Sequence, residues 1–250
     1  RRLCKNALKT REVFMKLSII IPVYNEENYI DAVIERVRAV SFQPEIELEL
    51  IAVDDCSTDK TPEHLKVWAD KGIVKVFRHD VNKGKGAALH TGFAQATGDV
   101  VVVQDSDFEY NPNELPKLLV PILDGRADVV FGARASFVGS ECHRVMYYWH
   151  SVVNSFLTRL CNMLADLTLH DMECCYKMFK REYLQKITLR EKRFGFEPEV
   201  TIKLARQHCR MYEVTVSYSG RTYQEGKKIN WKDGVSALRC ILKYGLLRMD

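Results

Sequence analysis

Short apolar runs alternate with amphipathic stretches along most of the chain. Strands are expected where the runs are rich in β-branched residues, at residues 17–21, 48–53, 73–77, 100–103 and 129–131. Helices are expected where apolar residues recur at helical spacing, at residues 27–40, 62–70, 87–96, 114–123, 145–164 and 196–207.

This alternation predicts an α/β fold. Strands joined by helices of about ten residues imply right-handed βαβ crossovers and a mainly parallel central sheet flanked by helices. Residues 15–250 lack an internal repeat and a Gly/Pro/Ser-rich linker, so we expect a single Rossmann-like domain. Its nucleotide-binding half would span about residues 15–110 and its acceptor half about residues 111–250.

Two acidic residues, Asp105 and Asp107, follow the four valines at residues 100–103. Such a run is typical of a strand inside a helix-covered parallel sheet, and ligands of these sheets collect at the carboxyl ends of the strands. Carboxylates suit hard ions such as Mg²⁺ and Mn²⁺, which take their remaining ligands from water and substrate phosphates. We therefore expect a divalent cation and a diphosphate substrate here. The alternative is a pair of loop aspartates that binds no ligand.

Composition limits the cellular compartments and the classes of protein to which the chain could belong. The chain of 250 residues is 46% hydrophobic and 28% charged, which suits one large globular domain. Its net charge of +4 neither demands a nucleic acid nor excludes an anionic membrane surface. The eight cysteines form no C-x-x-C pair, which favours reduced thiols in the cytosol over disulfides or a zinc site.

Three segments bear on location. Residues 1–14 are basic and lack the apolar core of a secretory signal, so we expect a basic extension or an expression remnant outside the fold. Residues 145–158 are too short for a membrane span of ~18 residues. They form either an interfacial helix, with Tyr147, Tyr148 and Trp149 near the headgroups, or a core helix. Residues 237–247 likewise fit an interfacial helix or one packed on the sheet.

Known phosphate motifs are missing from the sequence. Gly84-Lys85-Gly86 lacks the third glycine of G-x-G-x-x-G, and neither a P-loop nor a G-x-S-x-G motif occurs. We interpret these glycines as a tight turn with close helix packing, and direct phosphate contact is the alternative.

Several motifs in order resemble those of family 2 glycosyltransferases with the GT-A fold. The first four are IIIPVYNE (19–26), VDDCSTD (53–59), NKGKG (82–86) and QDSD (104–107). Later segments are similar to the branch of dolichyl-phosphate mannosyltransferase and bacterial polyprenyl-phosphate glycosyltransferases: FGAR (131–134), DMECCYK (171–177), GFEPE (195–199) and SGRTYQEGKK (219–228). The resemblance covers about residues 16–232.

The resemblance implies roles for individual residues. The nucleoside would be held by Pro22, Tyr24, Glu26, Val53 and Asp55. Within that group, Asp55 would accept from the base, although loop capping is an alternative for it and for Asp54. The sugar diphosphate would lie at Asp105, Ser106 and Asp107, with the metal held by Asp105, Asp107 and Glu109. Cationic positions near the phosphates are matched by Arg134, Arg221 and Lys227.

Other matches are less direct. Arg144 is a further phosphate candidate or a surface arginine. Lys177 stands where relatives often carry Arg, and Cys174-Cys175 replaces smaller polar residues of some relatives. The acceptor contacts are therefore left open.

The expected reaction mainly requires stabilisation of a leaving group. Transfer of the sugar expels a nucleoside diphosphate, whose charge a metal ion and Arg or Lys can stabilise. A phosphate monoester acceptor has a second pKa near 6 and relaxes the need for a general base. If a base is used, Asp171 and Glu197 are the candidates, with helix capping and a salt bridge as their alternatives. The expected catalytic residues are Asp107, Arg134, Asp171 and Glu197.

Residues and resemblance together predict an inverting, metal-dependent glycosyltransferase. It would move a hexose, mannose or glucose, from a GDP- or UDP-sugar to polyprenyl or dolichyl phosphate at the cytosolic face of a membrane. The inversion and the lipid acceptor are implied by the resemblance. One alternative is transfer to a saccharide or another hydroxyl acceptor, and another is a nucleotide-binding module without catalysis. Nucleic acid is not an expected partner, because base-stacking aromatics are not interleaved with Lys and Arg.

Overall fold

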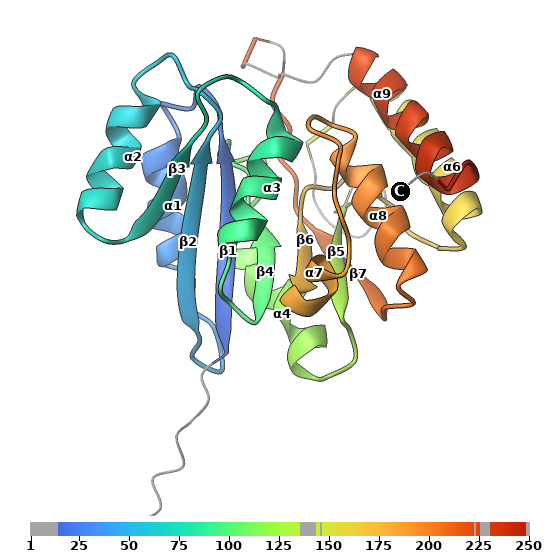
Figure 1. The fold of residues 1–250 in the computed structure, drawn as a ribbon, viewed down its shortest axis with the longest axis horizontal. Coiled ribbons are helices and arrows are strands. Elements are labelled where there is room, and N and C mark those ends of the chain that lie inside the picture. Colours follow the sequence, from blue (N-terminus) through green and yellow to red (C-terminus); the bar gives the residue numbers. More distant parts are fainter. Residues whose placement is uncertain (1–14, 136–143, 146, 223, 226–230, 249–250) are drawn as a thin grey trace, which may run out of the picture.

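The computed structural model describes residues 15–135, 144–145, 147–222, 224–225 and 231–248 (Figure 1). Its strands are β1 (Lys16–Val23), β2 (Glu47–Asp54), β3 (Val74–Arg78), β4 (Val100–Val103), β5 (Val129–Arg134), β6 (Lys177–Lys180) and β7 (Met211–Val216). Its helices are α1 (Ile30–Arg38), α2 (Thr61–Asp70), α3 (Lys85–Gln95), η1 (Pro112–Glu114), α4 (Leu115–Leu123), α6 (Tyr148–Ala165), α7 (Arg181–Gln185), α8 (Phe196–Arg206), α9 (Trp231–Ile241) and the π-helical turn η2 (Leu242–Leu246).

The seven strands form one sheet in the order β3-β2-β1-β4-β6-β5-β7. Strand β6 pairs antiparallel with both of its neighbours, and every other pairing is parallel. Six strands therefore end at the same edge of the sheet. This arrangement confirms the predicted α/β fold with a mainly parallel sheet.

The core follows from the apolar runs. Strand β4 is buried along its whole length, as are Ile19, Ile20 and Ile21 of β1, because helices cover both faces of the sheet. Helix α3 is drawn beside β1 in Figure 1 and contacts both β1 and β2. Its small residues Ala87, Ala88 and Gly92 are buried and allow this close approach.

A second apolar cluster holds the C-terminal helices together. Helices α6, α8 and α9 contact one another beyond the β5–β7 side of the sheet (Figure 1). The shared cluster contains Leu157, Cys161, Met172, Ile202, Ala237, Cys240, Ile241 and Tyr244. Residues 237–247 therefore pack on other helices, so the alternative of a helix packed on the sheet was wrong, and an interfacial role for this segment stays a prediction.

Three elements escaped the sequence prediction. Strand β6 has only four residues and begins and ends with lysine. Strand β7 lies at the edge of the sheet, is mostly half-buried, and contains the charged Glu213. Helix α7 has five residues. Residues 1–14 lie outside the described residues, and no helix in the described ranges is long and apolar enough to cross a membrane.

Candidate active site

The loops that follow β1, β2 and β4 meet at the carboxyl edge of the sheet. In the parallel register Pro22 lies opposite Val53, and Ile20 lies opposite Val103. The Ser106 hydroxyl donates to the Pro22 carbonyl at 3.0 Å, which fixes the loop after β4 against the end of β1. The structure thus brings together the predicted donor-site residues Pro22, Tyr24, Glu26, Val53, Asp55, Asp105, Ser106 and Asp107.

Each of these loops contains a residue with a left-handed backbone. The φ angles are 51° at Asn25, 66° at Cys56 and 59° at Phe108. Left-handed backbone is uncommon for any residue other than glycine and is an outlier for a bulky one such as Phe108. Such strained positions cluster at functional sites, where the surrounding structure maintains them.

Arg221 joins three of the acidic side chains. Its Nη2 lies 2.9 Å from Asp107 Oδ2 and 3.2 Å from Glu26 Oε1. Its Nε lies 3.7 Å from Glu109 Oε1, and the same carboxylate oxygen accepts from the Arg221 backbone N–H at 2.8 Å. The predicted phosphate cation therefore lies at the predicted metal carboxylates.

Lys85 holds the other predicted metal ligand. Its Nζ lies 2.8 Å from Asp105 Oδ1 and 3.0 Å from Oδ2, and 3.8 Å from Glu197 Oε1. Gly84, with φ of 97°, turns the chain into α3, where an added Cβ would lie 2.5 Å from the Lys192 carbonyl oxygen. The interpretation of these glycines as a tight turn with close packing is correct. Lys85 belongs to the motif NKGKG, but its contact with Asp105 was not predicted from the sequence.

The electrostatics of the acidic loop call for positive charge. Burial, together with the negative charges of Asp105 and Glu109, raises the pKa of Asp107 to about 7 despite Arg221. A divalent cation would relieve this repulsion. The donor set therefore suits Mg²⁺ or Mn²⁺, although the described residues contain no cluster of three or more His, Cys, Asp or Glu side chains able to hold a metal. This is consistent with ions that use one or two protein carboxylates and complete their shell with phosphates and water.

Glu109 also has a clear structural contact. Its Oε2 accepts from the Tyr218 hydroxyl at 2.8 Å, while Oε1 accepts from the Arg221 backbone. Both carboxylate oxygens thus hold the segment that carries Arg221. Its role as a third metal ligand stays a prediction.

Asp54 and Asp55 hold loops, as in the capping alternative. Asp55 accepts from the backbone N–H groups of Lys83 at 2.9 Å and Gly84 at 2.6 Å, and its Oδ1 lies 2.7 Å from His79 Nδ1. Asp54 accepts from the backbone of Ser57. The contact of Asp55 with a base stays a prediction.

Arg134 and Asp171 form a buried bidentate ion pair. Asp171 is 0% exposed and accepts from Arg134 Nε at 2.5 Å and Nη2 at 2.7 Å. Asn154 donates to the same carboxylate. Burial alone would raise the pKa of Asp171, but the Arg134 charge and these hydrogen bonds outweigh it and lower the pKa. A lowered pKa and two occupied oxygens make Asp171 a poor general base.

Glu197 and Glu173 have different surroundings. Glu197 Oε2 and Glu173 Oε1 are buried and accept no hydrogen bond from the residues that the structure describes. Burial, followed by the charge of Glu197, raises the pKa of Glu173 to about 8. Glu173 was missed as a site residue, because an acidic residue beside two cysteines gives no signal of a distant carboxylate partner.

Two of the remaining predicted cations, Arg144 and Lys177, bind backbone carbonyls. Arg144 Nη1 donates to the Gly220 carbonyl and contacts Glu225, each at 3.0 Å, so it holds the chain next to Arg221. Lys177 is fully buried and donates to the carbonyls of Met172 and Cys174, so it supports a turn. Lys227 lies outside the described residues.

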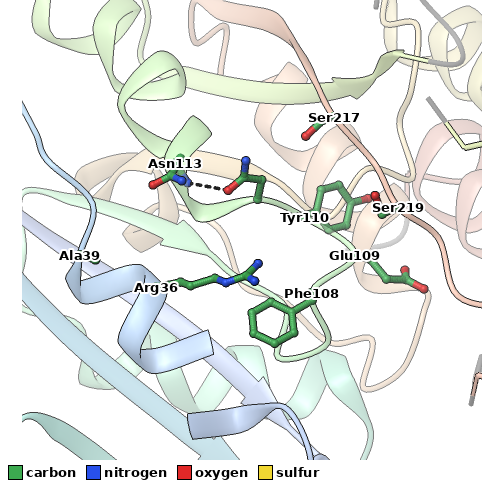
Figure 2. A pocket seen from close by; sticks show the side chains of 9 residues that line it. Arg36, Ala39, Phe108, Glu109, Tyr110, Asn113, Ser217 and Ser219 are labelled. Carbon is green, nitrogen blue, oxygen red and sulfur yellow. Dashed lines mark hydrogen bonds between the residues drawn. The ribbon is translucent and has the colours of Figure 1, made fainter. Parts of the chain in front are cut away.

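A pocket of about 410 Å³ adjoins the acidic loop (Figure 2). Arg36 lies across the Phe108 ring at 4.3 Å on one side, and Glu109 points away from that pair. The pocket is lined by Arg36, Ala39, Phe108, Glu109, Tyr110, Asn111, Asn113, Ser217 and Ser219. It shares Phe108 and Glu109 with the loop that carries Asp107.

A sequence model described as glycosyl transferase family 2 matches residues 18–188, most of the chain. The chain belongs to glycosyl transferase family 2. This assignment confirms the sequence resemblance and shows that the protein is a glycosyltransferase, which overturns the alternative of a binding module without catalysis.

Relatives of this family 2 glycosyltransferase act on polyprenyl phosphates, according to their names. Undecaprenyl-phosphate 4-deoxy-4-formamido-L-arabinose transferase of Pseudomonas aeruginosa is 30% identical over 215 residues, covering 84% of this chain and 60% of that protein. Dolichol-phosphate mannosyltransferase of Pyrococcus furiosus is 38% identical over 120 residues, covering 48% and 33%. The chain thus spans less than two thirds of the length of these relatives.

Solved structures of similar shape are GT-A glycosyltransferases. Glucosyl-3-phosphoglycerate synthase of Mycobacterium tuberculosis, solved with Mn²⁺, UDP and phosphoglyceric acid, has a TM-score of 0.69 at 21% identity, covering 92% of this chain and 78% of that one. TarS of S. aureus with UDP-GlcNAc has a TM-score of 0.62 at 22% identity, covering 92% and 66%. At this identity the likeness shows the GT-A fold alone.

Proposed function

We propose that this family 2 glycosyltransferase moves a hexose from a GDP- or UDP-sugar to polyprenyl phosphate and uses Mg²⁺ or Mn²⁺. The observation that carries the proposal is the meeting of Asp105 and Asp107 with Lys85 and Arg221 at the carboxyl edge of the sheet. Paired carboxylates with cations beside them suit a diphosphate that is bound through a metal ion. The lipid acceptor is supported by the names of the relatives.

The proposed reaction is a single displacement with inversion. A phosphate oxygen of the acceptor forms a bond to the anomeric carbon while the bond to the donor diphosphate breaks, and the electron pair leaves with the nucleoside diphosphate. Asp105 and Asp107 would hold the divalent ion, which supplies charge stabilisation to the diphosphate when bound. Arg221 would add a positive charge beside the leaving group, where its fork can bind two phosphate oxygens.

A lipid phosphate is favoured over a hydroxyl acceptor because Asp171, one of the two candidate bases, is already bound in an ion pair. A phosphate needs no general base at neutral pH, and both oxygens of Asp171 are already bound by Arg134. A hydroxyl acceptor would require a base. Glu197, whose buried Oε2 accepts no hydrogen bond within the described part of the chain, is the better candidate for the base of a transfer to a hydroxyl acceptor.

Exposed aromatic side chains support a membrane surface as the place of action. On α6, Tyr148 and Trp149 are each 72% exposed, and on α9 Trp231 is 75% and Val235 57% exposed. The two helices run side by side in parallel, since Gly234 lies beside Val153 and Gly245 beside Leu164. The exposed Tyr148, Trp149 and Trp231 therefore gather near the amino ends of the two helices. This placement suits the headgroup region of a bilayer, and a cytosolic bilayer face would match the reduced cysteines.

The decisive experiment is a donor and acceptor screen. UDP-glucose and GDP-mannose would each be offered with a short polyprenyl phosphate, with the unphosphorylated polyprenol as a matched acceptor and with EDTA as a metal control. We expect transfer only to the phosphate and only with a divalent ion. Efficient transfer to a soluble saccharide, without transfer to polyprenyl phosphate, would establish the alternative acceptor instead.

Membrane association is tested separately by flotation with anionic vesicles. We expect binding that weakens with salt, because each Lys or Arg near an anionic surface contributes roughly 1 kcal/mol. Trp149→Ser should reduce flotation, whereas Val81→Ser, which removes an apolar residue that is 59% exposed outside α6 and α9, should not. Equal flotation of the two variants would contradict the assignment of this surface.

A further inference from the structure

Two of the three predicted metal ligands, Asp105 and Asp107, are bound by cations of the chain itself. Lys85 Nζ contacts both oxygens of Asp105, at 2.8 Å and 3.0 Å. Arg221 Nη2 lies 2.9 Å from Asp107 Oδ2. These contacts place a positive charge where a metal ion would have to approach each aspartate.

The charges around the two aspartates both attract and repel a metal ion. When ionised, the five carboxylates of Glu26, Asp105, Asp107, Glu109 and Glu197 exceed the two cations Lys85 and Arg221 by three negative charges. A divalent ion would offset two of these charges. The attraction of the carboxylates for this ion is opposed by its repulsion from the two side-chain cations at close range.

Lys85 is the cation better suited to change partner. It begins α3, and its ammonium group ends a flexible four-carbon stem. Arg221, by contrast, is held by several carboxylates and through its backbone. A diphosphate bound beside Asp105 would offer new anionic oxygens to the Lys85 ammonium group.

We propose that Lys85 is a positioning residue that occupies Asp105 until a metal ion and a diphosphate enter, and then moves to the diphosphate. The diphosphate would draw Lys85 away from Asp105, where the metal ion binds, and the metal ion would offset the carboxylate charges that repel the diphosphate. The two ligands would therefore bind cooperatively. This inference rests on the proposed function in one respect, namely that the metal ion lies between Asp105, Asp107 and a diphosphate. By linkage, each ligand must strengthen the other by the same factor.

The test measures binding rather than turnover. Mn²⁺ affinity would be determined by electron paramagnetic resonance on the full chain, alone and with saturating UDP or GDP. The variants are Lys85→Met, which removes the charge, and Lys85→Arg, which keeps it. Lys83→Met is the matched control, because Lys83 is exposed in the same loop and loses the same charge.

For wild type we expect weak Mn²⁺ binding that either nucleotide strengthens by at least ~5-fold, the lower end of ordinary coupling between sites. Lys85→Met should bind Mn²⁺ alone at least ~10-fold more tightly than wild type, about 1.4 kcal/mol. It should also lose most of the strengthening by nucleotide. Lys85→Arg should keep the coupling, and Lys83→Met should match wild type.

Three results would overturn the inference. If Lys85→Met binds Mn²⁺ alone more weakly or equally well, Lys85 does not compete with the metal ion. If Mn²⁺ and nucleotide bind wild type independently, there is no coupling to explain. If Mn²⁺ binds wild type in neither condition, metal dependence in the proposed function fails as well, which distinguishes that failure from a failure of Lys85 alone.

Discussion

The buried pair of Arg134 and Asp171 makes a prediction about stability that the structure specifies closely. Asp171→Asn keeps the shape of the side chain and removes its charge. Arg134, whose side chain is 15% exposed, would then lose the carboxylate that binds both its Nε and its Nη2. Asn154 accepts from Arg134 Nη2 at 3.1 Å, and the Tyr218 ring lies 5.0 Å from the guanidinium carbon, but both groups are neutral.

The expected loss is about 3–5 kcal/mol of unfolding free energy, the usual result when one partner of a buried ion pair is removed. Most of this loss comes from the buried arginine charge, which would no longer be balanced by the carboxylate of Asp171. Asp124→Asn is the matched control, because Asp124 pairs with Arg126 at the surface, where the two side chains are 49% and 52% exposed. Such a pair contributes only about 0–1 kcal/mol.

Urea unfolding at several pH values would measure both variants. Because the folded structure lowers the pKa of Asp171, its contribution is complete above the unfolded value of about 3.9 and disappears as the pH falls through the folded value. The gap between wild type and Asp171→Asn should therefore be constant from pH 8 to about pH 5 and shrink only in stronger acid.

Two results would refute this reasoning. A loss below ~1 kcal/mol, equal to that of the surface control, would mean that Arg134 is not held as the structure shows. A gap that grows in acid would mean that folding raises the pKa of Asp171 instead of lowering it.

Three further changes have expected outcomes. Asp107→Asn should reduce turnover by at least ~100-fold while unfolding normally in urea, and full activity of this variant in EDTA would contradict its metal role. Arg221→Lys should raise the Kd for the nucleotide in a calorimetric titration, because a point charge does not replace the arginine fork; an unchanged Kd would place Arg221 away from the donor. Glu49 is buried, but hydrogen bonds from Lys75, Ser18 and Thr97 outweigh the effect of burial and lower its pKa to about 2. Glu49→Gln should therefore cost about 2–3 kcal/mol of stability at pH 7, a loss that fades as the pH falls from about 4.5 towards 2; equal unfolding midpoints for wild type and variant at pH 7 would rule this out.

The sheet could be predicted from the sequence because its central strands are buried on both faces. A valine run such as Val100–Val103 needs no tertiary context to be recognised, and the acidic residues that follow it inherit their place from the register of β4 on β1. The short strand β6 could not be found in this way. Lys177 points its ammonium group at backbone carbonyls in the interior, a contact that periodicity cannot anticipate.

The contacts that site residues make with distant segments could not be predicted from the sequence either. Asp171 was selected as a carboxylate that could act as a base, yet its carboxylate is bound by Arg134 from a strand end 37 residues earlier. Glu173 was passed over, although burial and, next, the charge of Glu197 from helix α8 raise its pKa. Motifs reveal which side chains carry chemistry, whereas pKa and accessibility depend on contacts between segments.

The position of Arg221 beside the acidic loop shows how such contacts between distant segments form. Arg221 and Glu26 are 195 residues apart in the chain. Beyond the end of β7, the Ser217 N–H donates to Glu114, and the Ser219 N–H donates to the Glu109 carbonyl at 2.9 Å. The Arg221 N–H then donates to the Glu109 carboxylate. Alternate residues of the segment after β7 are thus bonded, one after another, to the segment after β4, so the position of the arginine is set by the same loop that carries Asp107. A change in either segment must therefore alter both the carboxylates and the cation that faces them.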